Sequence, residues 1–318
     1  MNNDTSSQSS TDSHLVLNQI LLELVRERKY QRIGRWIKRI IVLLILLGLV
    51  IYAFVSGDDE VGPNTKPHVG IVDISGEMSD AKGANADDFA MGMDGAYKNK
   101  GLKALILRIN SPGGSPVQAE YMYNIVNYYK SKHPKIKMYA VCVDLCASAA
   151  YYVAVAADEI YASPASMVGS IGVLYNGFGF VDIIQKVGVT RRLQTAGVNK
   201  GFMDPFSPVT PSQTKKLQTM LDIVHQQFIN RVKTGRGSRL LVDEDTFSGL
   251  FWTGEQAMAM GLIDGFASSG QLARDIIKVD STIDYTHKQT VFDRVTKNLG
   301  TAMADELPLS FGFKPGLR

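Results

Sequence analysis

The most pronounced pattern in the chain is an uncharged apolar run near its beginning. From Ile40 to Gly57 eighteen residues carry no charge, which is close to the minimum length for a helix that crosses the ~30 Å hydrocarbon core of a bilayer. Basic side chains precede the run and acidic ones follow it, which predicts a single-pass anchor with its N-terminus in the cytoplasm. A cleaved signal peptide would have a shorter apolar core and would not follow a 39-residue polar leader, and a buried core helix does not fit the charged flanks.

The residues before this run divide into two parts. Residues 1–13 are small and polar, and we expect them to be disordered. Residues 14–37 are typical of an amphipathic helix, with Leu17, Leu21 and Leu24 at helical spacing and five basic side chains after them. Such a helix fits an anionic membrane surface and equally fits pairing with its own copies, and the pattern does not choose between these interpretations.

After a turn-rich linker at residues 58–67, short apolar segments alternate with amphipathic ones. Strands are predicted at residues 68–74, 102–109, 136–143, 159–162 and 169–174. Helices are predicted at residues 116–131, at 147–156, from Thr210 onward and from Thr253 to Gly261, three of them preceded by a capping box. Leu217, Leu221, Val224 and Phe228 form one stripe on the helix that starts at Thr210. Strands separated by helices predict an α/β fold with a largely parallel sheet, in one domain over residues 68–280 that is followed by a C-terminal extension, 281–318.

Composition and charge exclude several classes of protein. Two cysteines among 318 residues rule out a disulfide scaffold and a four-cysteine zinc module. Residues 1–57 hold seven basic and four acidic side chains, so this segment accounts for the whole net charge of +3. The rest of the chain is neutral, and no nucleic-acid surface is predicted.

Two segments are candidates for chemistry. A Gly-Gly turn follows a buried strand in Asn110-Ser-Pro-Gly-Gly114, where backbone N–H groups could approach a ligand closely. Ser148 stands between small residues where a strand meets a helix, which suits a nucleophile and equally suits an ordinary capping serine. The five histidines (His14, His68, His133, His225, His287) are isolated from these motifs, so neither a Ser-His-Asp triad nor a histidine metal site is predicted.

Together these segments resemble the S49 family of serine proteases, the signal peptide peptidase or protease IV type, in its short single-domain form. The resemblance rests on five motifs in order: Asn110-Ser-Pro-Gly-Gly114, Ala147-Ser-Ala-Ala-Tyr-Tyr152, Val168-Gly-Ser-Ile-Gly-Val173, Gly197-Val-Asn-Lys200 and Thr253-Gly…Ala257…Gly261-Leu-Ile-Asp264. It implies a Clp protease/crotonase-like catalytic domain, a spiral of β-β-α units, preceded by one N-terminal transmembrane helix.

The resemblance also implies roles for particular residues. Ser148 aligns with the nucleophile and Lys200 with the general base, because an uncharged lysine amine can accept the serine proton where no histidine is available. Ser170 matches a serine that orients the lysine, and the backbone N–H groups of Gly114 and Ala149 match the oxyanion hole. Where the family commonly has Gly-Gly after the serine, this chain has two alanines. Cys142 and Cys146 flank this site, and two buried thiols are favoured over a disulfide; Tyr151 and Tyr152 are expected to serve packing.

The function implied is that of a membrane-anchored serine endopeptidase that degrades signal peptides and other membrane-derived, apolar peptides. The resemblance places it in a bacterial inner membrane, with the catalytic domain on the periplasmic side. It implies a homo-oligomer, a ring or dome with sites shared between subunits, and it implies no metal, no cofactor and no nucleic acid. Two alternatives stay open: a crotonase-type acyl-CoA enzyme, and a non-enzymatic membrane scaffold of protease ancestry.

Overall fold

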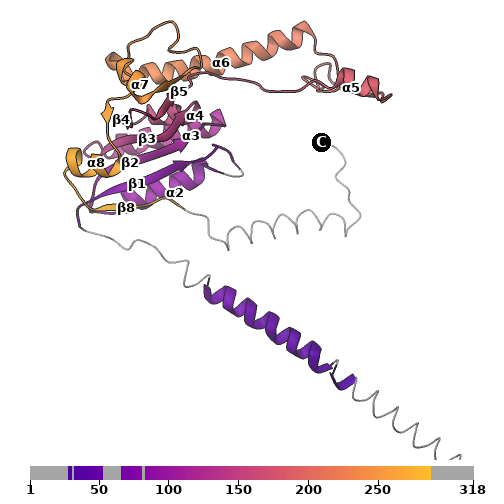
Figure 1. Ribbon diagram of the computed structural model, residues 1–318, viewed down its shortest axis with the longest axis horizontal. Coiled ribbons are helices and arrows are strands. Elements are labelled where there is room, and N and C mark those ends of the chain that lie inside the picture. The colour runs from indigo at the N-terminus through magenta and orange to yellow at the C-terminus, as the bar shows by residue number, and fades with distance from the viewer. Residues whose placement is uncertain (1–27, 31, 53–65, 81–82, 288–318) are drawn as a thin grey trace, which may run out of the picture. The chain divides into compact units, whose positions relative to one another are not determined.

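The computed structural model describes residues 28–30, 32–52, 66–80 and 83–287 (Figure 1). The chain divides into two compact units, one of residues 62–288 and one of residues 1–61 together with 289–318. The leader 1–13, the amphipathic segment up to residue 27, the end of the apolar run at 53–57, the linker up to residue 65 and the extension from residue 288 lie outside the described residues.

In the smaller unit, residues 32–52 form a helix that includes the first part of the apolar run. Its apolar side chains are exposed throughout, as Leu43 (65%) and Leu44 (60%) illustrate. Within the described ranges, no helix combines the length and the apolar character needed to cross a membrane.

The larger unit is built on one eight-stranded sheet. Its strands are β1 (His68–Ser75), β2 (Leu102–Ser111), β3 (Lys137–Ala147), β4 (Glu159–Ala162), β5 (Met167–Gly169), β6 (Phe251–Thr253), β7 (Gly265–Phe266) and β8 (Thr282–Asp284). The order is β6-β5-β3-β2-β1-β8, with β4 also paired to β3 and β7 paired to β4. Every pairing is parallel except that of β5 with β6, which confirms the α/β class and the largely parallel sheet.

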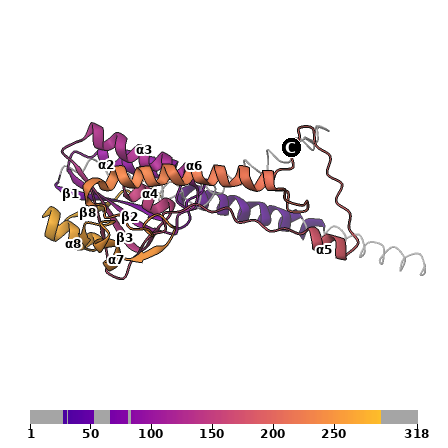
Figure 2. The same cartoon turned by 90° about the horizontal axis from the view of Figure 1, so that it is seen from above.

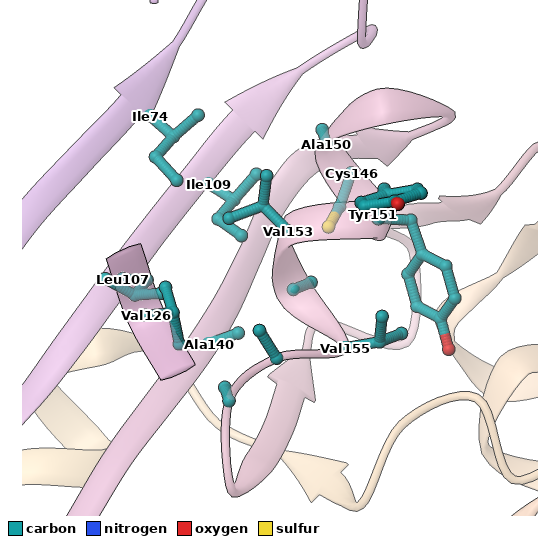
Figure 3. Packing of buried hydrophobic residues seen from close by; sticks show 14 of the residues in the cluster. Ile74, Leu107, Ile109, Val126, Ala140, Cys146, Ala150, Tyr151, Val153 and Val155 are labelled. Atoms are coloured by element: carbon teal, nitrogen blue, oxygen red, sulfur yellow. The ribbon is translucent and has the colours of Figure 1, made fainter. Parts of the chain in front are cut away.

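The central strand β2 is buried on both faces because its side chains alternate between two apolar clusters. Leu105, Leu107 and Ile109 of β2 point into the larger cluster, whereas Ala104 and Ile106 point into the smaller one. Figure 3 shows the larger cluster, where side chains of β1, β2 and β3 meet those of the helices that cover this face of the sheet. Continuous apolar runs are typical of parallel strands with both faces covered, which explains the apolar run of β2.

The helices begin and end largely where the capping residues predict. They are α2 (Ala86–Tyr97), α3 (Pro116–Lys132), α4 (Ala149–Ala154), α5 (Val181–Lys186), α6 (Pro211–Arg236), α7 (Gly254–Ala259) and α8 (Ser269–Gln271), with a 3-10 turn at Gly237–Arg239 and a π-helical turn at Leu272–Ile277. Thr210 with Gln213 and Thr253 with Gln256 form complete capping boxes. The box predicted for Ser115 is only half formed, because the Gln118 side chain accepts a hydrogen bond from the Ala86 N–H instead and so ties α3 to α2.

Several elements differ from the sequence prediction, and α2, α5, β6 and β7 were not predicted. The strand predicted at residues 169–174 is β5 at Met167–Gly169, and the chain leaves the sheet where the prediction continued it. Strand β3 runs four residues further than predicted, because it pairs with β5 beyond the point where its pairing with β4 ends. Residues 282–284, assigned from sequence to the C-terminal extension, form β8 and pair with β1.

A long excursion leaves the domain between β5 and β6. Residues 174–210, here called the arm, contain α5 and not one buried residue. Figures 1 and 2 both show α5 at the far end of the arm, away from the sheet. The arm returns through α6, whose stripe is only half-buried at Leu217, Leu221 and Val224 and becomes buried at Phe228.

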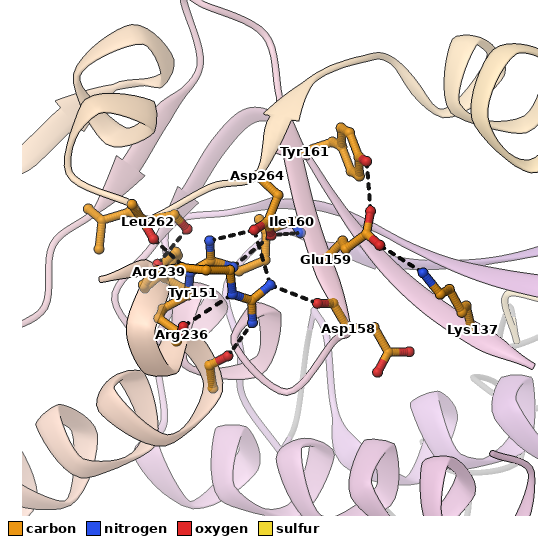
Figure 4. A network of polar contacts seen from close by, with 12 residues as sticks. Lys137, Tyr151, Asp158, Glu159, Ile160, Tyr161, Arg236, Arg239, Leu262 and Asp264 are labelled. Atoms are coloured by element: carbon orange, nitrogen blue, oxygen red, sulfur yellow. Dashed lines mark hydrogen bonds and ion pairs between the residues drawn. The ribbon is translucent and has the colours of Figure 1, made fainter. Parts of the chain in front are cut away.

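The C-terminal end of α6 is fastened to the domain by a buried charge network (Figure 4). The Arg236 guanidinium, 1% exposed, donates to both oxygens of Asp264 at 2.7 and 2.9 Å. Arg239 donates to the same carboxylate at 3.0 Å, and the Tyr151 hydroxyl donates to the Leu262 carbonyl at 2.7 Å. The bonds of Arg236 and Arg239 fix the end of α6, which forms one wall of the site described next.

Candidate active site

Ser148 occupies a sharp turn between β3 and α4. Its backbone angles, φ 54° and ψ −125°, lie in a region that non-glycine residues rarely adopt. The Ser148 N–H donates to the Gly169 carbonyl at 2.8 Å, which fixes the turn to the end of β5. In the described structure the Ser148 side chain makes no capping hydrogen bond to α4, so the interpretation as an ordinary capping serine is wrong. A strained strand-to-helix turn with an uncommitted hydroxyl is the arrangement that presents a serine nucleophile.

The Gly-Gly turn packs directly against this serine. A Cβ on Gly113 would lie 2.8 Å from the Ser148 Cβ and 2.8 Å from the Ala149 nitrogen. At Gly114 a Cβ would lie 2.3 Å from the Met78 carbonyl oxygen, and both glycines have positive φ, 95° and 140°. The turn is held by the Met78 N–H, which donates to the Gly113 carbonyl at 2.7 Å. Close backbone approach, not flexibility, requires glycine at both positions.

Ser170 leaves the sheet beside Ser148. Ala147 of β3 pairs with Gly169 of β5, so the residues that follow them are neighbours at the same edge. Ser170 also has a positive φ, 50°, and its N–H donates to the Leu250 carbonyl at 2.8 Å. Two strained serines therefore stand together at the carboxyl ends of adjacent parallel strands, where α/β proteins place their sites.

A cleft of about 710 Å³ opens at this edge. Four of the predicted site residues line it: Ser148, Ala149, Gly114 and Ser170. Its size is in the range of ligand-binding cavities in proteins. The structure thus brings together four of the five residues that the sequence predicts for the site.

Lys200 is the predicted site residue that the single chain does not bring to this cleft. It lies exposed in the arm, in a turn where its N–H donates to the Gly197 carbonyl at 3.1 Å, and it is absent from the residues that line the cleft. Asp204, which from sequence could have paired with it, accepts from the Ser207 hydroxyl at 2.6 Å and pairs with Arg191 at 3.4 Å. The Ser207 hydrogen bond, assisted by Arg191, lowers the pKa of the Asp204 carboxyl.

Three polar side chains stand out among the cleft residues that sequence reasoning missed. His225 and Glu120 line it, and so does Tyr152, which was assigned to packing alone. His225 stands next to Val224 of the predicted stripe on α6, and its Nε2 lies 3.0 Å from the Ile171 carbonyl oxygen. Nothing in the motifs pointed to it, because it is isolated in sequence and reaches the site only through the packing of α6.

The two cysteines are free, buried thiols, as the sequence analysis favoured. They face one another because Ile109 pairs with Cys142 and Ser111 with Cys146, so β3 bulges by two residues between them. Burial, and secondarily the neighbouring Cys142, raises the pKa of the Cys146 thiol. A neutral thiol sealed in the core is a poor nucleophile, which leaves Ser148 as the candidate. Among the described residues no three His, Cys, Asp or Glu side chains converge as a metal site would require.

Comparison with known proteins gives a family match for part of the chain. Residues 130–280 match the sequence model of peptidase family S49. This match confirms the resemblance to peptidase family S49 that the motifs indicated.

Individual relatives cover parts of the chain. Protease 4 of Haemophilus influenzae is 29% identical over 214 residues, 64% of this chain and 34% of that protein. A Na⁺/H⁺ antiporter NhaA of Brucella melitensis is 43% identical over 173 residues, 54% of this chain. The chain spans only 34% and 23% of the lengths of these two relatives, and the antiporter's name describes a protein of which this chain matches less than a quarter.

Among solved structures, a substrate-peptide complex of a mutant 1510-N membrane-bound stomatin-specific protease covers 75% of this chain and 100% of its own. The identity is 18% and the TM-score 0.43, which is too low to support a conclusion about the fold.

Proposed function

We propose that this protein is a serine endopeptidase that uses Ser148 as its nucleophile and Lys200 as its general base. The observation that supports it best is the position of Ser148, strained at a strand-to-helix turn and lining the same cleft as Ser170 and Gly114. The match of residues 130–280 to peptidase family S49 agrees with peptide-bond hydrolysis.

In the proposed reaction, the Ser148 Oγ attacks the carbonyl carbon of the scissile peptide bond, and its proton passes to the neutral Lys200 amine. The oxyanion accepts hydrogen bonds from the Gly114 and Ala149 N–H groups. The lysine then donates the proton to the leaving amine, which departs and leaves an acyl-serine ester. Water attacks this ester while the lysine accepts its proton; the serine oxygen then leaves, takes that proton from the lysine, and the peptide acid is released.

The arm supplies the lysine from a neighbouring copy in this proposal. Within one chain Lys200 is exposed and does not line the cleft, whereas the arm around it presents uncovered apolar side chains such as Leu174 (81%) and Val198 (98%). Exposed apolar surface of this kind is typical of protein–protein interfaces. A ring or dome of copies, each arm against the next domain, would bury this surface and complete each site.

The anchor and the substrates belong to the same proposal. The uncharged run at residues 40–57 would hold the chain in a bacterial inner membrane with the domain on the periplasmic side, where its substrates would be signal peptides and other apolar membrane-derived peptides. The catalytic domain would follow the Clp protease/crotonase-like spiral. A neutral domain tethered at a bilayer suits apolar substrates.

Labelling with a fluorophosphonate, which reacts with activated serines, tests the proposal. The full-length protein should be labelled at Ser148 and should hydrolyse peptides, and S148A should do neither. Ser131 is a matched control, since its exposed hydroxyl donates to the Tyr128 carbonyl within α3 and does not line the cleft, so S131A should keep both labelling and activity. An unlabelled wild-type protein with no peptidase activity would favour the non-enzymatic scaffold, and thioester hydrolysis without peptide hydrolysis would favour the acyl-CoA enzyme.

A further inference from the structure

One wall of the cleft ends in a charged cluster formed by Glu120 of α3, Tyr152 of α4 and Arg231 of α6. Arg231 Nη2 donates to Glu120 Oε1 at 2.6 Å, and the Tyr152 hydroxyl donates to Glu120 Oε2. Asn124 donates to Oε1 as well, at 3.2 Å. Three helices therefore place their polar side chains on one carboxylate.

Arg231 is held in a single orientation. Its Nε donates to the Tyr152 oxygen at 3.3 Å, and its guanidinium carbon lies 4.6 Å from the centroid of the Tyr123 ring. A guanidinium held by a carboxylate, a hydroxyl and an aromatic ring has little conformational freedom left to lose when a substrate binds. The cluster is therefore a preorganised part of the wall, not a pair of mobile surface charges.

Glu120 faces the cleft and Arg231 stands behind it. Among the described residues that line the cleft, Glu120 is the one with a carboxylate, and none has an ammonium or guanidinium group. Burial alone would raise the pKa of the Glu120 carboxyl, but hydrogen bonds from Tyr152 and Arg231 lower it below its ordinary value. Glu120 is thus ionised at neutral pH, and Arg231 cancels its charge.

We propose that Arg231 is a specificity-determining residue: it neutralises Glu120, so that the cleft selects uncharged side chains over lysine and arginine. This inference rests on the proposed peptidase function. The walls next to the cluster are apolar (Pro116, Ala119, Val224, Phe228), so they suit aliphatic and aromatic side chains. Without Arg231, the same carboxylate would end an apolar cleft with an uncompensated negative charge, which favours a cationic side chain.

The test uses full-length protein and peptides that differ only in the residue before the scissile bond: leucine, lysine or glutamate. Wild type should prefer leucine. R231Q should raise the lysine-to-leucine ratio of kcat/KM about tenfold, mainly through KM, as expected for one charge-assisted contact. E120Q should act in the opposite direction and raise the glutamate-to-leucine ratio, because it leaves Arg231 unpaired.

Two controls isolate the charge pair. The double variant E120Q/R231Q has neither charge and should show neither gain. K233Q removes a cation two residues further along α6, where Lys233 lies over the Phe247 ring and does not line the cleft, and it should leave both ratios unchanged.

The outcomes distinguish the role of Arg231 from the proposed peptidase function on which it rests. An unchanged lysine-to-leucine ratio in a folded R231Q that still hydrolyses the leucine peptide overturns the role of Arg231 and leaves the peptidase standing. If R231Q does not fold, as judged by its thermal melt, an unchanged glutamate-to-leucine ratio in E120Q overturns the proposal by itself. Absence of Ser148-dependent hydrolysis of all three peptides by wild type would instead refute the peptidase function.

Discussion

At the scale of single residues, the site depends on backbone positions that tolerate almost no side-chain volume. Ser148 holds its strained turn because Gly113 packs against it and the Gly169 carbonyl accepts its N–H. Strain of this kind persists only where the surroundings fix it, and here the surroundings are two glycine-containing turns at the edge of the sheet.

Replacement of Gly113 by alanine should therefore damage catalysis more than folding. The new Cβ would lie 2.8 Å from the Ala147 oxygen, the Ala149 nitrogen and the Ser148 Cβ, so the nucleophile must shift. We expect kcat/KM to fall about 100-fold, the usual result of a displacement near 1 Å in an active site. Gly95 in α2 is the control, because its added Cβ meets only Tyr285 Cδ1, at 3.6 Å, and G95A should keep full activity. Equal peptide hydrolysis by G113A and G95A would contradict this account of the turn.

Lys200 is expected to be indispensable although it lies outside the cleft of its own chain. Both K200A and K200R should lose peptidase activity and fluorophosphonate labelling, because arginine stays protonated and cannot act as the base. H225Q, which keeps a hydrogen-bond donor for the Ile171 carbonyl, should retain activity within a few-fold. Loss of activity in H225Q together with full activity in K200A would instead assign the base to the histidine in the cleft.

At the scale of elements, α6 depends on the charge network at its end. Arg236 is 1% exposed and Asp264 14%, and removal of one partner of a buried pair leaves the other charge uncompensated. D264N should lower the free energy of unfolding by about 3 kcal/mol, as measured by urea denaturation. D94N breaks the exposed pair between Asp94 and Lys98 (52% and 75% exposed). It should change the free energy of unfolding by less than about 1 kcal/mol.

The same network predicts how the stability of the fold changes at acid pH. Burial would raise the pKa of Asp264, but the hydrogen bonds from Arg236 and the Ile160 N–H hold it below its ordinary value. A carboxyl with a lowered pKa in the folded state adds stability above its unfolded pKa, about 4, and this contribution is lost as the pH falls further. Urea denaturation from pH 7 to pH 3 should show a steeper acid decline for wild type than for D264N, and parallel profiles would refute this assignment.

At the scale of the whole molecule, the separation of Ser148 from Lys200 can be tested by mixing two inactive chains. S148A and K200A should each be inactive alone, and co-assembled they should regain about a quarter of wild-type activity, since random mixing leaves one interface in four with both residues intact. Background activity in verified mixed oligomers would show that each site forms within one chain.

The proposed orientation is tested by a reporter that is active only outside the cytoplasm, fused after Arg318. The charge difference across residues 40–57 predicts an active reporter. Replacement of Arg35, Lys38 and Arg39 by glutamine should reduce its activity, because these charges set the orientation. A silent reporter on a stably expressed wild-type fusion would contradict an N-in arrangement.

The sequence by itself indicated the central strands, the capped helices and the turn at Ser148. Apolar runs gave β1 and β2, capping residues gave the start of α6 and α7, and the motifs gave Ser148, Ser170 and the glycine turn, because these features depend on neighbours along the chain. Tertiary structure alone decided the rest. It placed β5 two residues earlier than predicted and ended it at Gly169, where its pairing with β6 ends. It also diverted Gln118 from its capping box to the Ala86 N–H. It also brought Glu120, Tyr152 and Arg231 together from three helices and kept Lys200 outside the cleft. Contacts between residues far apart in sequence leave no periodic trace, and only the packing of helices on a common sheet determines them.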